Sequence, residues 1–310
     1  MAVAAVAQPP GTEGSGGPPS PDEVPQSARR RRLTPYLLLL PGLAWLALFF
    51  AVPLVTLAGT SLQTPAPGGE IGAYVPGLRV ANYTDALGEY ATQFGRSFLY
   101  AGIATVLALL IGYPLAYLIA HRAGRWRNLL LVLVVAPFFT SFVLRTVAWR
   151  QILAEEGWVV RTLKFVGIVP QDAALTVSAF AVVAGITYNF LPFMTLPLYA
   201  SIERIDPRLI EAGADLYGSP WTVLRKVTLP LSLPGIVAGT LLTFIPAAGD
   251  YVNASLLGGR NNVMVGNVVE RQFFTIADYP TAAALSFVLM AAILVLVTVY
   301  IRRAGTEELV

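Results

Sequence analysis

Six apolar runs, each long enough to cross a lipid bilayer, constrain the fold of this 310-residue chain more than any other feature. A bilayer core of about 30 Å requires roughly 20 helical residues, because each residue adds about 1.5 Å. Only 13% of the residues are charged, against about 25% in an average soluble domain. The sequence therefore predicts an all-α, polytopic membrane protein. Its six predicted spans are Tyr36–Ala58, Ser97–Ala120, Asn128–Gln151, Thr176–Tyr199, Gly235–Leu257 and Thr281–Ile301.

Lysine and arginine gather in alternate connecting segments, and this bias sets the expected orientation. With the N-terminus in the cytoplasm, the inner segments carry 13 of the 21 basic residues. These are Arg29, Arg30, Arg31, Arg32, Arg122, Arg125, Arg127, Arg204, Arg208, Arg225, Lys226, Arg302 and Arg303. We therefore expect both termini in the cytoplasm. Basic residues beside spans are the ordinary topology signal, so they do not indicate a nucleic-acid partner.

The chain is expected to consist of one membrane domain with a tail at each end. Residues 1–33 are rich in Ala, Pro, Gly and Ser and end in basic residues, which predicts a disordered cytoplasmic tail. Residues 34–303 form the predicted transmembrane domain, and residues 304–310 a short cytoplasmic tail. Between the first two spans, residues 59–94 are predicted to form a long polar loop that folds over the outer face.

Several kinds of chemistry are excluded by residues that the sequence lacks. There is no cysteine, which removes disulfides, thiol nucleophiles and thiolate metal sites. The one histidine, His121, lies in a short basic segment, cannot form a His-Glu-x-x-His metal motif, and is expected to have no functional role. Neither of the two lysines, Lys164 and Lys226, follows a glycine, so no P-loop is present. We expect no enzyme activity, metal or cofactor, and any ATP hydrolysis must belong to another subunit.

The inner loop of residues 200–232 carries the strongest local pattern in the chain. Asp206 is a favourable N-cap, and Pro207 suits the first helical position, where a missing N–H costs nothing. Gly218 provides a C-terminal stop, after which a second short helix is predicted to end at Leu229-Pro230. The loop is therefore expected to be a helix–turn–helix outside the bilayer.

One face of the first helix in this loop is apolar and small, which bears on what the loop contacts. Helical spacing places four residues on that face: Leu209, Ala212, Gly213 and Leu216. Glu211 and Asp215 lie four positions apart on its flank. The face either enters a groove on a partner protein or rests on lipid headgroups. Two carboxylates are unfavourable beside an anionic leaflet, so docking on a partner is favoured.

Glu211-Ala212-Gly213, followed by Val227-Thr228-Leu229-Pro230, resembles the EAA loop of bacterial ABC importer permeases. The family pattern is Glu-Ala-Ala, three residues, Gly, nine residues, Ile-x-Leu-Pro, and the spacing from Glu to Pro matches without a gap. Gly213 replaces the second Ala, Tyr217 takes the Gly position with Gly218 one residue later, and Val227 replaces Ile. The resemblance implies that residues 206–230 form coupling helices that dock on an ATPase subunit. The residues that it assigns to coupling are Asp206, Pro207, Glu211, Ala212, Gly213, Asp215, Leu216, Tyr217, Gly218, Leu229 and Pro230.

Three further stretches resemble the PotB-like permeases of spermidine/putrescine importers: Pro137–Ser141, Leu191–Glu203 and Leu256–Gly259. The likeness covers about residues 35–303. It implies a MetI-like core in a bacterial plasma (inner) membrane, where the chain forms half of a translocation path for polyamines. The implied partners are an ABC ATPase dimer, a second, PotC-like permease, an extracytoplasmic substrate-binding protein and membrane lipids. Ferric iron, an inorganic anion or a sugar remain alternative substrates, and an ATP-independent secondary transporter is the alternative class.

Asp250 is the most prominent polar residue within a predicted span, where polar groups are costly and mark functional sites. It follows Pro246 and Gly249, two residues that are expected to interrupt the helix of the fifth span. Interrupted helices within a membrane are tolerated where they line a cavity. A carboxylate among aromatic rings suits an ammonium group, and the candidate path residues are Asp250, Tyr251, Tyr188, Asn189, Phe244 and Arg145. Alternatively, Asp250 forms a structural ion pair with Arg145, or is solvated at the outer mouth. An intramembrane aspartyl protease is excluded, because Ala247 replaces a required glycine and no second intramembrane Asp is available.

Overall fold

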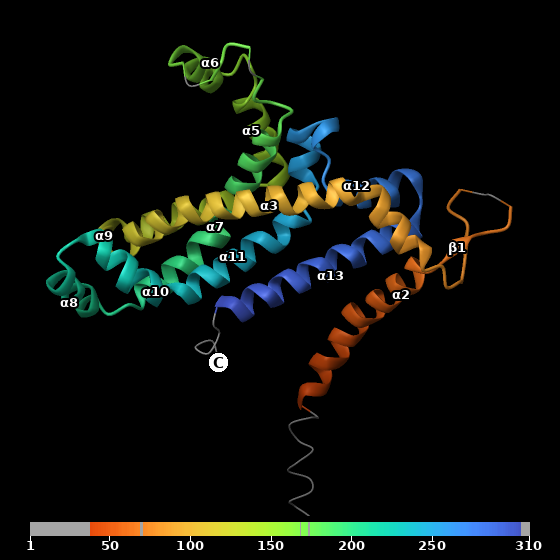
Figure 1. The fold of residues 1–310 in the computed structure, drawn as a ribbon, viewed down its shortest axis with the longest axis horizontal. Coiled ribbons are helices and arrows are strands. Elements are labelled where there is room, and N and C mark those ends of the chain that lie inside the picture. Colours follow the sequence, from red (N-terminus) through yellow and green to blue (C-terminus); the bar gives the residue numbers. More distant parts are fainter. Residues whose placement is uncertain (1–37, 69–70, 168, 173, 305–310) are drawn as a thin grey trace, which may run out of the picture. The chain divides into compact units, whose positions relative to one another are not determined.

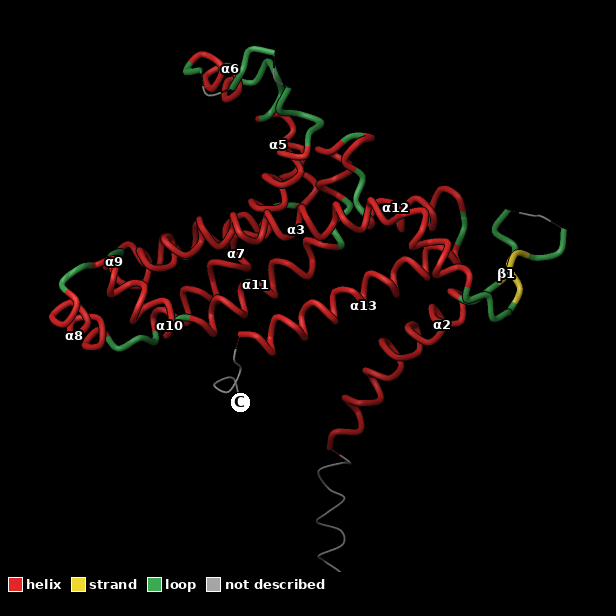
Figure 2. The backbone as a smooth tube through the Cα atoms, viewed as in Figure 1, coloured by secondary structure: helices red, strands yellow, loops and turns green. Residues whose placement is uncertain are grey.

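The computed structural model of the chain is mostly helical (Figures 1 and 2). The residues that it describes are 38–68, 71–167, 169–172 and 174–304. The chain forms two compact units, Met1–Thr56 and Leu57–Val310. The predicted tail over residues 1–33 lies outside the described residues, as does the predicted tail over residues 304–310 apart from its first residue.

Four helices among the described residues are long and apolar enough to cross a membrane. The first is Leu38–Ser61, which contains the π-helical turn η1 (Ala47–Ala51) and α2 (Val52–Ser61). The others are α3 (Ala81–His121), α7 (Ala179–Glu203) and α13 (Tyr279–Ala304). They confirm four of the predicted spans as helices, with shifted bounds.

The shorter elements connect these spans. They are β1 (Thr64–Pro65), β2 (Tyr74–Val75), η2 (Gly124–Trp126), α4 (Arg127–Val135), η3 (Ala136–Phe139), α5 (Phe142–Ile152), α6 (Trp158–Phe165), α8 (Pro207–Tyr217), α9 (Pro220–Val223), η4 (Leu224–Thr228), α10 (Leu229–Leu231), α11 (Leu233–Ala248), η5 (Ala254–Gly258), η6 (Arg260–Asn262), α12 (Val265–Arg271) and η7 (Gln272–Ile276).

Two further pairs of helices among the described residues are bent, and counting each pair as one span gives up to six spans. Gly124–Phe139 turns by 98° into α5, and Pro220–Leu231 turns by 68° into α11. The predicted span Gly235–Leu257 is wrong at its C-terminal end. Helix α11 stops at Ala248, Gly249 is non-helical, and η5 is a separate turn.

The predicted polar loop over residues 59–94 is wrong in its second half. Helix α3 begins at Ala81 and runs for 41 residues, with a break in helical geometry at Tyr90. Its first turns bury Ala86, Tyr90 and Phe94 in a cluster with residues of α12 and α13. These three side chains recur every four residues on one helix face, but the polar residues between them lower the mean hydropathy of the segment.

The loop that remains is a small hairpin fixed to the start of α13. Strands β1 and β2 pair antiparallel, with Thr64 opposite Val75. The Tyr74 hydroxyl donates to Oδ1 of Asp278 at 3.2 Å, and the same oxygen accepts from the backbone N–H of Thr281 at 3.2 Å. Burial, together with the Asp278 carboxylate, raises the pKa of Tyr74 to about 12. The phenol therefore stays protonated and able to donate at physiological pH.

Helix α7 is the centre of the second unit. Of its most apolar window, 61% is buried, against 33% for α3 and 22% for α13. Small residues let its neighbours approach closely, since a Cβ on Gly239 of α11 would lie 3.0 Å from the backbone oxygen of Met194 in α7. Figure 1 shows α3, α7, α11 and α13 running along one direction, with α8 and α9 at one end of this bundle and α12 and β1 at the other.

Candidate functional site

The loop at one end of the bundle has the predicted helix–turn–helix form. The Asp206 carboxylate accepts from the backbone N–H of Arg208 at 2.9 Å and caps α8. Pro207 is the first residue of α8. The C-cap Gly218 has a φ of +67°, the left-handed conformation that favours glycine, and its N–H donates to the Ala214 oxygen at 2.8 Å.

Gly213 is the one buried residue of α8, and its environment explains why a small residue stands there. A Cβ at this position would lie 3.1 Å from Cγ2 of Val227 and 3.4 Å from Cγ1 of Val223. These valines belong to η4 and α9, so α8 packs directly against the second half of the loop. Replacement of the motif's second alanine by glycine therefore lets the two short helices approach each other.

The rest of the predicted docking face of α8 is open to solvent. Leu209 is 49% exposed and Leu216 is 74% exposed. Glu211 and Asp215 are also exposed, and no ion pair among the described residues involves either. An apolar surface flanked by two unpaired carboxylates is thus available at this end of the protein.

The second half of the loop ends one residue after the predicted helix end at Leu229-Pro230. From Pro220 it continues through the π-helical turn η4 to Leu231, where the chain bends into α11. Tyr217, which departs from the family pattern, lies under the Lys226 ammonium group, whose Nζ is 4.5 Å from the ring centroid. This cation–π contact joins the end of α8 to η4. Leu229 and Pro230 lie in the last turn before the bend.

Asp250 lies directly after the break that ends α11. Only 7% of it is exposed. Its Oδ1 accepts from the backbone N–H of Asn253 at 2.8 Å, and its Oδ2 accepts from the Asn253 side-chain amide at 2.9 Å. The carboxylate therefore holds the turn that follows the break, rather than pointing into an open cavity.

Asn253 connects this turn to two other helices. Its Oδ1 accepts from the Asn189 amide of α7 at 3.0 Å and from the Thr146 hydroxyl of α5 at 3.3 Å. Asn189 also donates to the Thr146 hydroxyl at 3.3 Å. We call these four buried side chains, Asp250, Asn253, Asn189 and Thr146, the polar network. Asp250 and Asn189 were predicted as path residues, whereas Asn253 and Thr146 were not.

The structure does not form the ion pair between Asp250 and Arg145 that the sequence left open. Arg145 instead places its guanidinium carbon 5.6 Å from the ring centroids of Phe138 and of Phe142. Its Nε and Nη1 atoms are buried and find no hydrogen-bond partner among the described residues. The Asp250 carboxylate accepts two hydrogen bonds from Asn253 instead.

The aromatic candidates divide between core and surface. Phe244 is 7% exposed and its ring stacks on Phe98 at 6.2 Å, a position in the core. Tyr188 packs edge-on against Trp149 at 5.4 Å. Tyr251 is 48% exposed.

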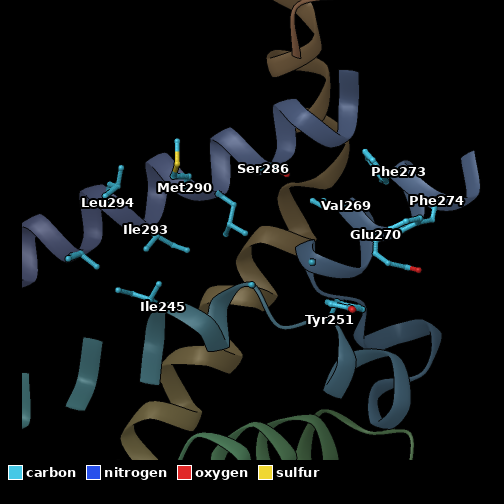
Figure 3. A pocket seen from close by; sticks show the side chains of 14 residues that line it. Ile245, Tyr251, Val269, Glu270, Phe273, Phe274, Ser286, Met290, Ile293 and Leu294 are labelled. Carbon is cyan, nitrogen blue, oxygen red and sulfur yellow. The ribbon is translucent and has the colours of Figure 1, made fainter. Parts of the chain in front are cut away.

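Tyr251 lines an open pocket of about 600 Å³ between α11, α12 and α13. Figure 3 shows Tyr251, Glu270, Phe273 and Phe274 at one end of it and Ile245, Met290, Ile293 and Leu294 at the other. Glu270 was not predicted as a site residue. Its signal in the sequence is the spacing of Glu270, Phe273 and Phe274 at i, i+3 and i+4, which places them on one helix face.

No metal-ligand cluster exists among the described residues: they contain no group of three or more His, Cys, Asp or Glu side chains that could hold an ion. His121 packs edge-on against Tyr117 at 4.9 Å.

Comparisons with known proteins agree with this architecture. Residues 108–304 match the family described as "Binding-protein-dependent transport system inner membrane component". The chain is 36% identical to the spermidine/putrescine transport system permease protein PotB of Haemophilus influenzae, over 84% of this chain and 90% of that protein. It is 35% identical to PotB of Escherichia coli K12, over 83% of this chain and 93% of that protein.

A solved structure supports the fold independently. A crystal structure of a bacterial ABC transporter involved in the import of the acidic polysaccharide alginate contains a chain that matches with a TM-score of 0.63. The match covers 91% of this chain and 98% of that one at 19% identity. At this identity the likeness concerns the fold alone.

Proposed function

The chain belongs to the family of binding-protein-dependent transport system inner membrane components and is a permease subunit of an ABC importer; on this premise we propose that it forms half of a translocation path for polyamines. The observation that carries the substrate class is the identity of 35–36% to two spermidine/putrescine permeases over more than four fifths of the chain. The Glu270 carboxylate and the Tyr251 and Phe274 rings, which line the pocket beside the α11 break, support it, because they suit a linear polycation.

Uptake of labelled spermidine tests the substrate class. Cells that carry the complete transporter are compared with cells that lack only this chain, and unlabelled putrescine, ferric iron and sugars are added as competitors. We expect uptake that requires the chain and that only polyamines inhibit. If ferric iron or a sugar inhibits uptake instead, the substrate belongs to that class. The assignment of the chain as a permease would not change.

We further propose that residues 206–230 couple the chain to a separate ATPase dimer. The support is the solvent-exposed face of α8 with its two unpaired carboxylates, which lies at one end of the bundle where a soluble partner has access. The chain itself lacks a P-loop, so the energy for import comes from that partner. The ATPase contacts Glu211, Leu209 and Leu216. Its movement displaces the loop, and the bend before α11 passes this displacement on to the span.

Glu211→Lys tests this coupling. We expect normal membrane insertion, loss of ATPase co-purification and loss of uptake, because the substitution reverses a charge in the docking face. The matched control is Glu156→Lys, which reverses an exposed charge in the turn before α6. Normal transport by Glu211→Lys would exclude the docking role.

The orientation and the other partners complete the proposal. Both termini and α8 face the cytoplasm, a PotC-like permease supplies the other half of the path, and an extracytoplasmic binding protein delivers substrate. The cysteine-free sequence allows a direct test with single cysteines at Pro67 and Ala212, which are both exposed. A membrane-impermeant maleimide should label Pro67→Cys in intact cells and Ala212→Cys only after lysis. The reverse labelling pattern would show that the chain has the opposite orientation in the membrane.

A further inference from the structure

The break after α11 has two sides, and they offer a cation very different surroundings. On one side Asp250 is buried and accepts two hydrogen bonds from Asn253. On the other side Tyr251 lines the open pocket between α11, α12 and α13. Asp250, the carboxylate that the sequence predicts as a path residue, therefore lies on the buried side of the break.

Helix α12 brings a second carboxylate to the open side. A Cβ on Gly266 would lie 2.6 Å from the Gly249 oxygen, so the start of α12 lies directly against the break. The Asn267 side-chain amide donates to the backbone carbonyl oxygen of Tyr251 at 2.7 Å and fixes this contact. Glu270 stands one helical turn further on and lines the pocket with Tyr251.

Glu270 is the only charged side chain among the described residues that line this pocket. No ion pair or hydrogen bond of its carboxylate occurs among the described residues. An unpaired carboxylate among apolar walls is unfavourable unless a cation meets it. The pocket therefore lacks a positive charge at this end.

Aromatic rings surround the place where that charge would sit. Tyr251 is 48% exposed, Phe273 43% and Phe274 76%, and Figure 3 shows all three with Glu270 at one end of the pocket. Ring faces attract an ammonium group, and apolar walls suit the methylene chain attached to it. Ile245, Met290 and Ile293 supply such walls at the other end.

We propose that Glu270, with Tyr251 and Phe274, binds one ammonium group of an alkylammonium substrate whose methylene chain lies along the apolar end of the pocket. This inference rests on the proposed function, because it assigns the cation-binding carboxylate of the polyamine path. It places that carboxylate at Glu270, whereas Asp250 is a positioning residue. A lipid acyl chain or an apolar face of the second permease would fill the groove but leave Glu270 unpaired.

The test is the KM for labelled spermidine in cells that carry the complete transporter with Glu270→Gln. We expect the KM to rise about tenfold, the scale of losing one charge-assisted contact, with little change in maximal rate. Glu270→Asp keeps the charge and should restore most of the affinity. Glu156→Gln removes an exposed carboxylate from the turn before α6 and should leave the KM unchanged.

An unchanged KM in Glu270→Gln would overturn the inference while polyamine uptake by the parent protein still supported the proposed function. Loss of co-purification of the second permease together with uptake would also overturn it, because Glu270 would then belong to a subunit interface. If wild-type cells transport no polyamine, the proposed function fails and the inference with it. If Glu270→Gln does not accumulate in the membrane, Phe274→Leu decides: a KM increase of about threefold supports the inference, and an unchanged KM overturns it.

Discussion

The loop of residues 206–230, which we propose as the coupling loop, and the polar network are built in opposite ways. The loop is held by contacts between residues close in sequence, such as Gly213 against Val223 and Val227. The network is held by hydrogen bonds between residues 43, 64 and 107 positions apart. The loop can therefore form from local signals, whereas the network forms only when α5, α7 and the α11 break have assembled.

This difference predicts two kinds of mutational effect. A substitution in the loop should disturb docking and leave the spans intact, because few long-range contacts depend on it. A substitution in the network should loosen the packing of the spans themselves, because each member satisfies a buried partner on another element. Transport assays cannot separate these effects, but stability measured together with transport can.

The largest effect on stability is expected from Asn253→Ala. The substitution leaves the buried Asp250 carboxylate without its side-chain donor and removes one of the two acceptors of the Asn189 amide. We expect the free energy of unfolding to fall by about 3 kcal/mol and uptake to fall with it. Thermal unfolding of the purified transporter in detergent measures the change.

Asn261→Ala is the matched control, because Asn261 is an exposed asparagine nearby in sequence, and it should unfold at the parent temperature. A double variant sharpens the comparison further. Asn189→Ala should cost less in the background of Asn253→Ala than alone, since the two side chains share a bond. Full additivity would show that the network is not a unit.

A smaller effect on stability, but a large one on transport, is expected from Gly213→Val. The added side chain meets Val227 and Val223, and overpacking of this kind costs about 1–3 kcal/mol. The cost falls on the loop, so we expect uptake and ATPase co-purification to fall while the melting temperature of the spans stays unchanged. Ala214→Val, at an exposed neighbouring position, is the control. A lowered melting temperature in Gly213→Val would break the distinction between the two regions.

The same contrast explains which features could be predicted from the sequence. The N-cap at Asp206 and the left-handed stop at Gly218 were predicted and are confirmed, because each depends on the residue and its immediate neighbours. The polar network was predicted only in part, since no local rule pairs Asn253 with Asn189 or Thr146. Only the packing of α7 against α5 and the α11 break brings these side chains together.

Hydropathy likewise located the spans but not their bends or the N-terminal extension of α3. The first turns of α3 are amphipathic, so their mean hydropathy resembles that of a loop even though Ala86, Tyr90 and Phe94 are buried. Glu270 escaped notice because it lies outside every predicted span. Its importance follows from the packing of α12 against the break, a tertiary contact that local sequence does not encode.

The smallest effect is expected from Asp206→Ala, which removes the cap of α8. Loss of an N-cap costs about 1 kcal/mol, enough to reduce the population of the formed helix by about fivefold where that helix is marginal. Because α8 is also held by Gly213 against α9 and η4, uptake should fall by less than this factor. Asp206→Ser keeps a capping oxygen and should transport normally. If Asp206→Ala abolished uptake as fully as Glu211→Lys, the carboxylate would be contacting the ATPase rather than only capping the helix, and the docking face would extend to the start of α8.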